Sequence, residues 1–134
     1  MVPLNHIFNE IIAMRVTRKQ LEDLKAPKDQ IYSFVRFELE GVEITEDLCV
    51  KYAQIFNWMW AADNLLKKEA RRKYIRIISP TRTKRLRIIN LALTKYIKSN
   101  TNLGWRRYKN AIEPNRVEYN LACARAFYRA TQVG

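Results

Sequence analysis

Lysine and arginine side chains supply the most evident chemistry in this sequence, and they are crowded into one segment. Between residues 67 and 87, 10 of 21 side chains are basic and only Glu69 opposes them. Phosphate oxygens bind such groups, and phosphate contacts dominate nonspecific affinity for nucleic acid. A solvated basic face is the plainer interpretation, but self-repulsion at this density destabilises a compact chain until counter-charge arrives. We therefore predict a polyanion partner.

The charge is also divided unevenly along the chain. The sequence has 134 residues and a formal net charge of +12. Residues 1–66 carry 7 basic and 10 acidic side chains, whereas residues 67–134 carry 18 basic and 3 acidic ones. Such asymmetry indicates that the basic C-terminal half binds a polyanion. We expect these side chains to contact nucleic acid: Arg15, Arg18, Lys19, Lys67, Lys68, Arg71, Arg72, Lys73, Arg76, Arg82, Lys84, Arg85, Arg87, Arg106 and Arg107.

Sequence patterns of enzymes and metal sites are absent. Three glycines cannot form a phosphate-cradling loop, and neither a nucleophile elbow nor an H-E-x-x-H motif occurs. The candidate zinc ligands His6, Cys49 and Cys123 are scattered rather than grouped at short spacings. We expect both cysteines to be small buried thiols. The sequence therefore predicts a binding or structural protein that is not an enzyme and uses no cofactor or metal.

Aromatic side chains could add base stacking if the partner is single-stranded. Four of them fall in an apolar stretch, and we expect these in the core: Tyr52, Phe56, Trp58 and Trp60. Trp105 and Tyr108 differ, because arginines and a lysine flank them. This pair is our aromatic candidate for contact with bases.

The spacing of apolar residues predicts an all-α protein. Amphipathic patterns predict helices over residues 4–25, 45–78, 80–99 and 114–132. We place Pro80 and Pro114 in the first turns of their helices, where the missing N–H costs nothing. A helix over the whole of 45–78 would reach about 50 Å, so its basic end either breaks or projects from the bundle.

Residues 28–44 fit two structures. Val35, Phe37 and Leu39 alternate with polar residues, which is typical of a strand, and Gly41 would permit a short β-hairpin over 31–44. The same stretch fits a short helix begun at Pro27 and ended at Gly41, which we favour. We expect two parts: an N-terminal arm over 1–44, and a helical bundle over 45–134 whose basic stretch 67–87 faces DNA.

In size and architecture, the chain resembles the major coat proteins of filamentous archaeal viruses with linear double-stranded DNA. Three features carry the resemblance: an arm over 4–40, the basic stretch over 67–87 and the closing helix over 114–132. The basic residues of this arm are Arg15, Arg18, Lys19, Lys25, Lys28 and Arg36. The acidic balance of the N-terminal half departs from the expected pattern.

The resemblance implies a helical nucleocapsid in which the protein wraps A-form duplex DNA without sequence preference. It implies that the coat protein pairs with itself or with a related coat protein as a homodimer or heterodimer within a filament. The expected location is then the virion, assembled in the host cytoplasm.

Two other binding classes remain open from the sequence. A helix-turn-helix regulator could span residues 75–98, with the helix from Pro80 reading a specific site. A small helical RNA-binding subunit of a ribonucleoprotein particle is the other, although we expect RNA less than duplex DNA. Either class implies a location in the cytoplasm or nucleoid. No run of 18 apolar residues occurs, so we expect no transmembrane segment.

Overall fold

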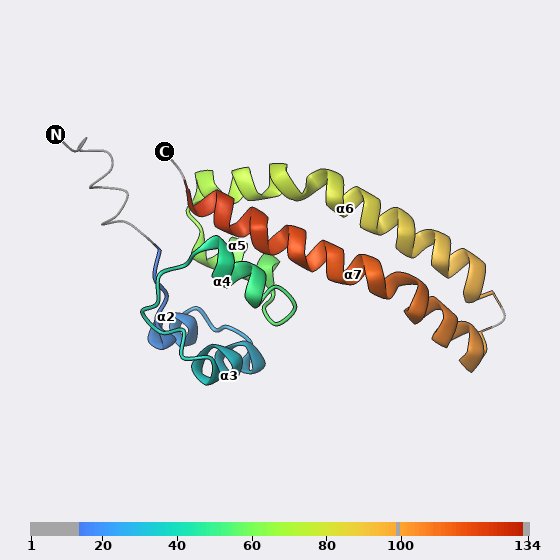
Figure 1. The fold of residues 1–134 in the computed structure, drawn as a ribbon, viewed down its shortest axis with the longest axis horizontal. Helices are drawn as coiled ribbons and strands as arrows, with labels where there is room; N and C mark the ends of the chain where they lie inside the picture. Colours follow the sequence, from blue (N-terminus) through green and yellow to red (C-terminus); the bar gives the residue numbers. More distant parts are fainter. Residues whose placement is uncertain (1–13, 99, 133–134) are drawn as a thin grey trace.

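Two long antiparallel helices dominate the computed structural model, which describes residues 14–98 and 100–132. Helices α6 (Lys68–Tyr96) and α7 (Asn102–Thr131) lie side by side, and the end that joins them projects beyond the rest of the chain (Figure 1). The prediction of an all-α fold is confirmed for the described residues, which contain no strand.

Four short helices form a head at the opposite end of this pair (Figure 1). They are α2 (Arg18–Asp23), α3 (Lys28–Arg36), α4 (Glu46–Lys51) and α5 (Trp58–Leu65). We use "head" for residues 14–66, which contain all four helices. Both α4 and α5 pack against α7, so the head covers only the part of the long pair nearest to it.

The main core joins the head to the long helices. Trp58 and Ala62 of α5 meet Tyr74 and Ile78 of α6 and Phe127 of α7. The alanines of α7 that complete this core are almost fully buried: Ala124, Ala126 and Ala130. Because these side chains are small, neighbouring helices approach α7 closely.

A second apolar cluster holds residues 14–44 in place. Val16, Leu21, Phe34 and Leu39 are buried together, and partly buried side chains from α4 and α5 pack against them. The described part of the segment that we expected as an arm therefore rests on the rest of the head.

Helices α2 and α3 end in the same way, and neither end uses a glycine. Lys25 and Glu38 follow the two helices with φ angles of 58° and 54°. Behind α3, the N–H of Leu39 donates to the carbonyl oxygen of Phe34 at 3.1 Å, as in a Schellman motif. The helix that we favoured between Pro27 and Gly41 is thus confirmed, although it ends earlier, at Arg36, and the β-hairpin over 31–44 does not form.

The helix expected over 4–25 is much shorter in the described residues. Thr17 caps α2 by accepting a hydrogen bond from the N–H of Gln20, so the helix begins at Arg18. Before it, Arg15 forms an isolated bridge with Glu43. The part of the prediction over residues 4–13 lies outside the described residues.

The segment 45–78 is not one helix, and the break that we left open as one outcome for its basic end occurs. Thr45 caps α4 as expected, but α4 ends at Lys51. Asn57 then starts α5 by accepting a hydrogen bond from the N–H of Trp60 at 3.0 Å. Leu66 is extended and separates α5 from α6, so the basic end belongs to a new helix.

The prolines were assigned wrongly. Pro80 lies inside α6 and Pro114 lies inside α7, where we had expected helices to begin. Tyr74, Ile78 and Ala92 are all buried, so packing continues along α6 on both sides of Pro80 and holds the helix together. Because α6 has no turn, a helix-turn-helix cannot occupy residues 75–98.

Candidate nucleic-acid interface

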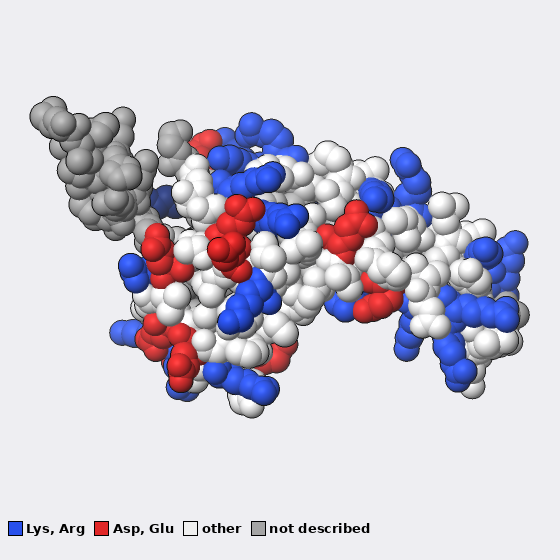
Figure 2. Space-filling view, in the orientation of Figure 1, with Lys and Arg blue, Asp and Glu red and all other residues white. Residues whose placement is uncertain are grey.

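A long stretch of the α6–α7 pair carries no carboxylate. From residue 70 to residue 112 the sequence has 13 basic and no acidic side chains. In Figure 2 the projecting end bears Lys and Arg with no Asp or Glu, whereas acidic side chains gather on the head and midway along the molecule. We call residues 70–112 the basic hairpin.

The outer side of α6 presents an open row of arginines. Arg72, Arg76 and Arg87 are exposed and lie on the side of the helix opposite the buried Tyr74 and Ile78. Arg72 pairs with Glu69 at 3.3 Å, in an exposed contact. Among the described residues, no carboxylate pairs with Arg76 or Arg87, so both guanidinium groups are available to a partner.

The projecting end adds further exposed cations. Arg106 and Arg107 are exposed at the start of α7, where Thr101 caps the helix. Trp105 is 41% exposed, but its indole N–H donates to Oδ1 of Asn100 at 3.0 Å. Its ring meets that of Tyr108 edge-on, with centroids 5.9 Å apart. The aromatic pair that we expected to contact bases is therefore held in place by contacts of its own.

The middle of the hairpin contains cations that already have partners. Arg85 is half-buried, bonds to Asn115 at 3.2 Å and stacks over the ring of Tyr119. Lys84 pairs with Glu118 at 3.1 Å. Arg85 thus holds the two helices together, while Lys84 forms an exposed pair that a phosphate could replace.

The predicted cations of the head lie apart from the hairpin. Arg15 donates to the carbonyl oxygen of Gly41 at 2.6 Å, and Arg18 pairs with Glu22 at 2.7 Å. Lys19 is exposed on the same short helix. Figure 1 places α2 on the far side of the head from α6. The structure does not gather these three residues with the other candidates.

The remaining candidates lie on α6 or next to it. Lys67 and Lys68 mark its start, and Lys73 donates to the carbonyl oxygen of Gln132 at 3.4 Å. Arg71 and Arg82 are exposed and, within the described chain, form no ion pair.

Sequence reasoning missed three exposed lysines on the hairpin: Lys95, Lys98 and Lys109. They lie beyond the densest basic run, 67–87, from which most of the candidates were taken. The sequence has no acidic residue over 70–112, and this pattern would have pointed to all three lysines as part of the same basic segment.

The cysteines carry no reactive chemistry. Burial, reinforced by the negative charge of Glu46, raises the pKa of the Cys49 thiol to about 12. Burial also raises the pKa of the Cys123 thiol, which lies beside Tyr74 and Tyr119. Since the thiolate is the nucleophile, neither residue is poised to react. The described residues hold no group of side chains that could bind a metal.

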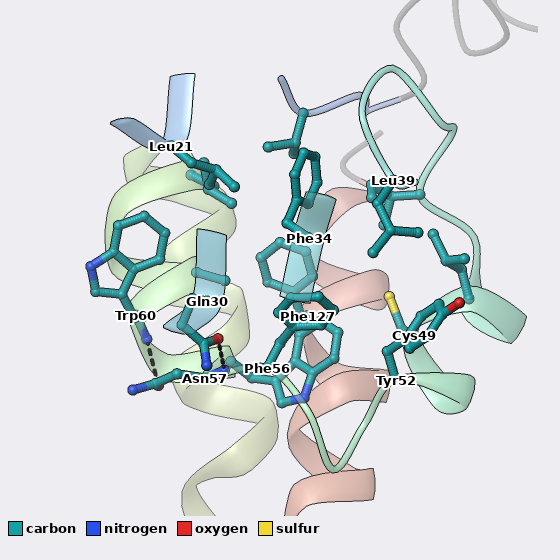
Figure 3. Close-up of a pocket in the computed structure, with 16 residues that line it drawn as sticks. Leu21, Gln30, Phe34, Leu39, Cys49, Tyr52, Phe56, Asn57, Trp60 and Phe127 are labelled. Atoms are coloured by element: carbon teal, nitrogen blue, oxygen red, sulfur yellow. Dashed lines mark hydrogen bonds between the residues drawn. The ribbon is translucent and has the colours of Figure 1, made fainter. Parts of the chain in front are cut away.

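An apolar cavity of about 80 Å³ lies between the main core and the second apolar cluster (Figure 3). The aromatic residues expected in the core line it: Tyr52, Phe56, Trp58 and Trp60. Gln30 and Asn57 lie at its edge, and Oε1 of Gln30 accepts a hydrogen bond from the backbone N–H of Asn57 at 2.7 Å. The thiol of Cys49 also lines the cavity, and its raised pKa keeps it protonated near neutral pH.

No family model, curated protein or solved structure matches this chain. In the part of the chain that the structure describes, no helix combines the length and apolar character needed to cross a membrane.

Proposed function

We propose that this chain is a structural DNA-binding protein that binds the phosphate backbone of duplex DNA through the basic hairpin, without sequence preference. One observation carries the proposal: 13 basic and no acidic side chains over residues 70–112, on a projecting pair of helices. Phosphate contacts need only positioned cations, and this arrangement supplies them over a long, open surface.

Two details favour a duplex over a single strand. The α6 arginines from Arg72 to Arg87 extend over about 23 Å of a continuous helix, which suits the regular phosphates of a duplex. Single-strand binding would call for free aromatic faces, and the edge-on contact between Trp105 and Tyr108 leaves these two rings only partly free.

The resemblance stated above makes the proposal narrower: a viral coat protein, alone or with a related one, that covers linear duplex DNA in a helical filament. Its support is the size of the chain, its all-helical fold and its basic helices. Saturation at one copy per few base pairs on long random duplex would support it. Sparse saturation would leave a DNA-binding protein that is not a coat.

The test of DNA binding is a salt titration on random duplex DNA and on RNA of the same sequence. Each phosphate contact contributes about 0.9 to the slope of log affinity against log salt. The double variant Arg76→Gln/Arg87→Gln should therefore lower the slope by about 2 on every duplex sequence.

The matched control removes two charges from the head, as Lys19→Gln/Lys28→Gln. If both double variants lowered the slope of log affinity against log salt equally, the proposal that the hairpin binds DNA would be contradicted. Tighter binding to RNA than to DNA would move the assignment to a ribonucleoprotein subunit.

A further inference from the structure

Helix α6 contains an 11-residue sequence repeat. Residues 71–79 read RRKYIRIIS and residues 82–90 read RTKRLRIIN, so five of nine positions are identical. Residues 93–98 read LTKYIK and begin a third copy, which keeps the lysine and a basic residue three positions after it. Eleven residues complete three helical turns with only about 20° left over, so equivalent positions of the repeat stay on one side of α6.

Each copy of the repeat carries a pair of cations three residues apart. The three pairs are Lys73 with Arg76, Lys84 with Arg87, and Lys95 with Lys98. Residues at this spacing are neighbours on a helix surface, so each pair concentrates positive charge at one place. Lys98 lies just beyond the end of α6, where the N–H of Ile97 still donates to the carbonyl oxygen of Leu93 at 3.0 Å. We call the three pairs the cation ladder.

The cation ladder lies on an open side of α6. Five of its six side chains are exposed, and Lys73 is half-buried. This side lies about 110° around the helix from Tyr74 and Ala92, which are buried where α6 packs on α7. Among the described residues, one carboxylate pairs with the ladder: Glu118 contacts Lys84 at 3.1 Å, in an exposed pair that a phosphate can replace.

The length of the ladder matches one turn of a DNA duplex. From the first pair to the third is 22 residues, or about 33 Å of helix, and one turn of the duplex is about 34–36 Å. Along a line parallel to the duplex axis, each strand crosses once in every turn. We propose that α6 lies along the duplex axis, so that the first and third pairs bind one strand a turn apart and the middle pair binds the other strand. This inference rests on the proposed function and states how the hairpin meets the DNA.

The unequal grooves of DNA explain the use of paired, flexible cations. The major groove is about 12 Å wide and the minor groove about 6 Å, so the second strand does not cross midway between the two crossings of the first. Lys84 and Arg87 start about 4.5 Å apart along α6, and their long side chains extend the range in which they reach this strand. A single strand has no second backbone for the middle pair, so the ladder fits a duplex.

The test varies how much of a duplex is charged. Duplexes of one fixed length carry ordinary phosphates in a central window of about half a turn or about one turn (about 5 or 10 base pairs) and neutral methylphosphonates elsewhere. The slope of log affinity against log salt should be larger for the wild type on the full-turn window, because only this window reaches all three pairs. Lys95→Gln/Lys98→Gln should lower the slope by about 2 on the full-turn window. On the half-turn window it should change the slope little, because the two remaining pairs suffice.

The matched control is Arg71→Gln/Arg82→Gln. It removes two exposed cations that also lie 11 residues apart on α6, but about 170° around the helix from the ladder. Its slope should stay close to that of the wild type on both windows. An equal loss for the two variants, or a wild-type slope that is already complete on half a turn, would overturn the inference and leave DNA binding intact. A wild type that also fails to bind a fully charged duplex would overturn the proposed function, and the inference with it.

Discussion

Arg85 in α6 donates a hydrogen bond from Nη1 to Oδ1 of Asn115 in α7, across 3.2 Å. Asn115 is only 7% exposed, and the guanidinium of Arg85 lies 5.5 Å from the ring centroid of Tyr119. This contact lies just beyond the main core, which includes Tyr74 and Ile78 of α6. It separates the part of the hairpin that packs on the head from the part that projects.

Replacing Arg85 should therefore lower stability. Arg85→Met removes the donor and leaves the buried amide oxygen of Asn115 without its hydrogen bond. This loss should lower the unfolding free energy by about 1–3 kcal/mol. Urea unfolding followed by circular dichroism measures this. The neighbouring Arg87→Met is the control, because Arg87 is exposed and should change stability by less than about 0.5 kcal/mol. Equal effects of the two changes would contradict a structural role for Arg85.

The projecting end depends on a close approach at Gly104. A Cβ atom at this position would overlap the backbone carbonyl oxygen of Tyr96, which cannot move as a side-chain tip could. Gly104→Ala should thus destabilise the junction of α6 and α7 by about 1–3 kcal/mol.

Hydrogen exchange locates this effect. Amides near Tyr96 and Gly104 should exchange faster in the variant, while those of the core around Tyr74 and Phe127 should change little. Unchanged protection at the junction would show that the two helices can separate there without cost.

The buried thiol of Cys49 predicts a loss of stability in base. Its pKa rises from 9.0 to about 12 on folding, so the folded state holds the proton more tightly than the unfolded state. The resulting stabilisation is complete below pH 9 and is lost as the pH rises towards 12. Urea midpoints measured between pH 8 and 11 should fall with pH, and less steeply in Cys49→Ala. An identical pH dependence in the two proteins would exclude this cause.

Pro80 should reduce the stability of α6. It lacks the N–H that would bond to the carbonyl oxygen of Arg76, and its side chain is exposed. Pro80→Ala should raise the unfolding free energy by about 1–3 kcal/mol, whereas Ser79→Ala next to it should change it by about 0.5 kcal/mol or less. A lower melting temperature for Pro80→Ala would indicate that the hairpin is built around a bend at this residue.

The existence of the helices was readable from the sequence, but their limits were not. The dipeptide Ser79-Pro80 looks the same in the sequence whether it starts a helix or lies inside one. The packing of Tyr74 and Ile78 on α7 places it inside a helix. The end of α3 before Glu38 escaped notice because this residue takes a positive φ, a conformation expected of glycine, and the helix was expected to continue to Gly41.

The candidate interface was predicted in part. Charge density located the basic side chains of α6 and the start of α7. It could not distinguish Arg85, which is held between two helices, from Arg87, which is open to solvent. That difference depends on contacts between residues 30 positions apart.

The separation of charge between head and hairpin makes the molecule a strong electric dipole. The head carries 7 basic and 9 acidic side chains, whereas the basic hairpin carries 13 positive charges and no negative ones. The electrostatic field of a duplex would orient such a molecule as it approaches, with the hairpin toward the DNA and the head away from it. A coated duplex would then present heads to the solvent. Its electrophoretic mobility would reflect their weakly negative surface rather than the highly basic composition of the chain.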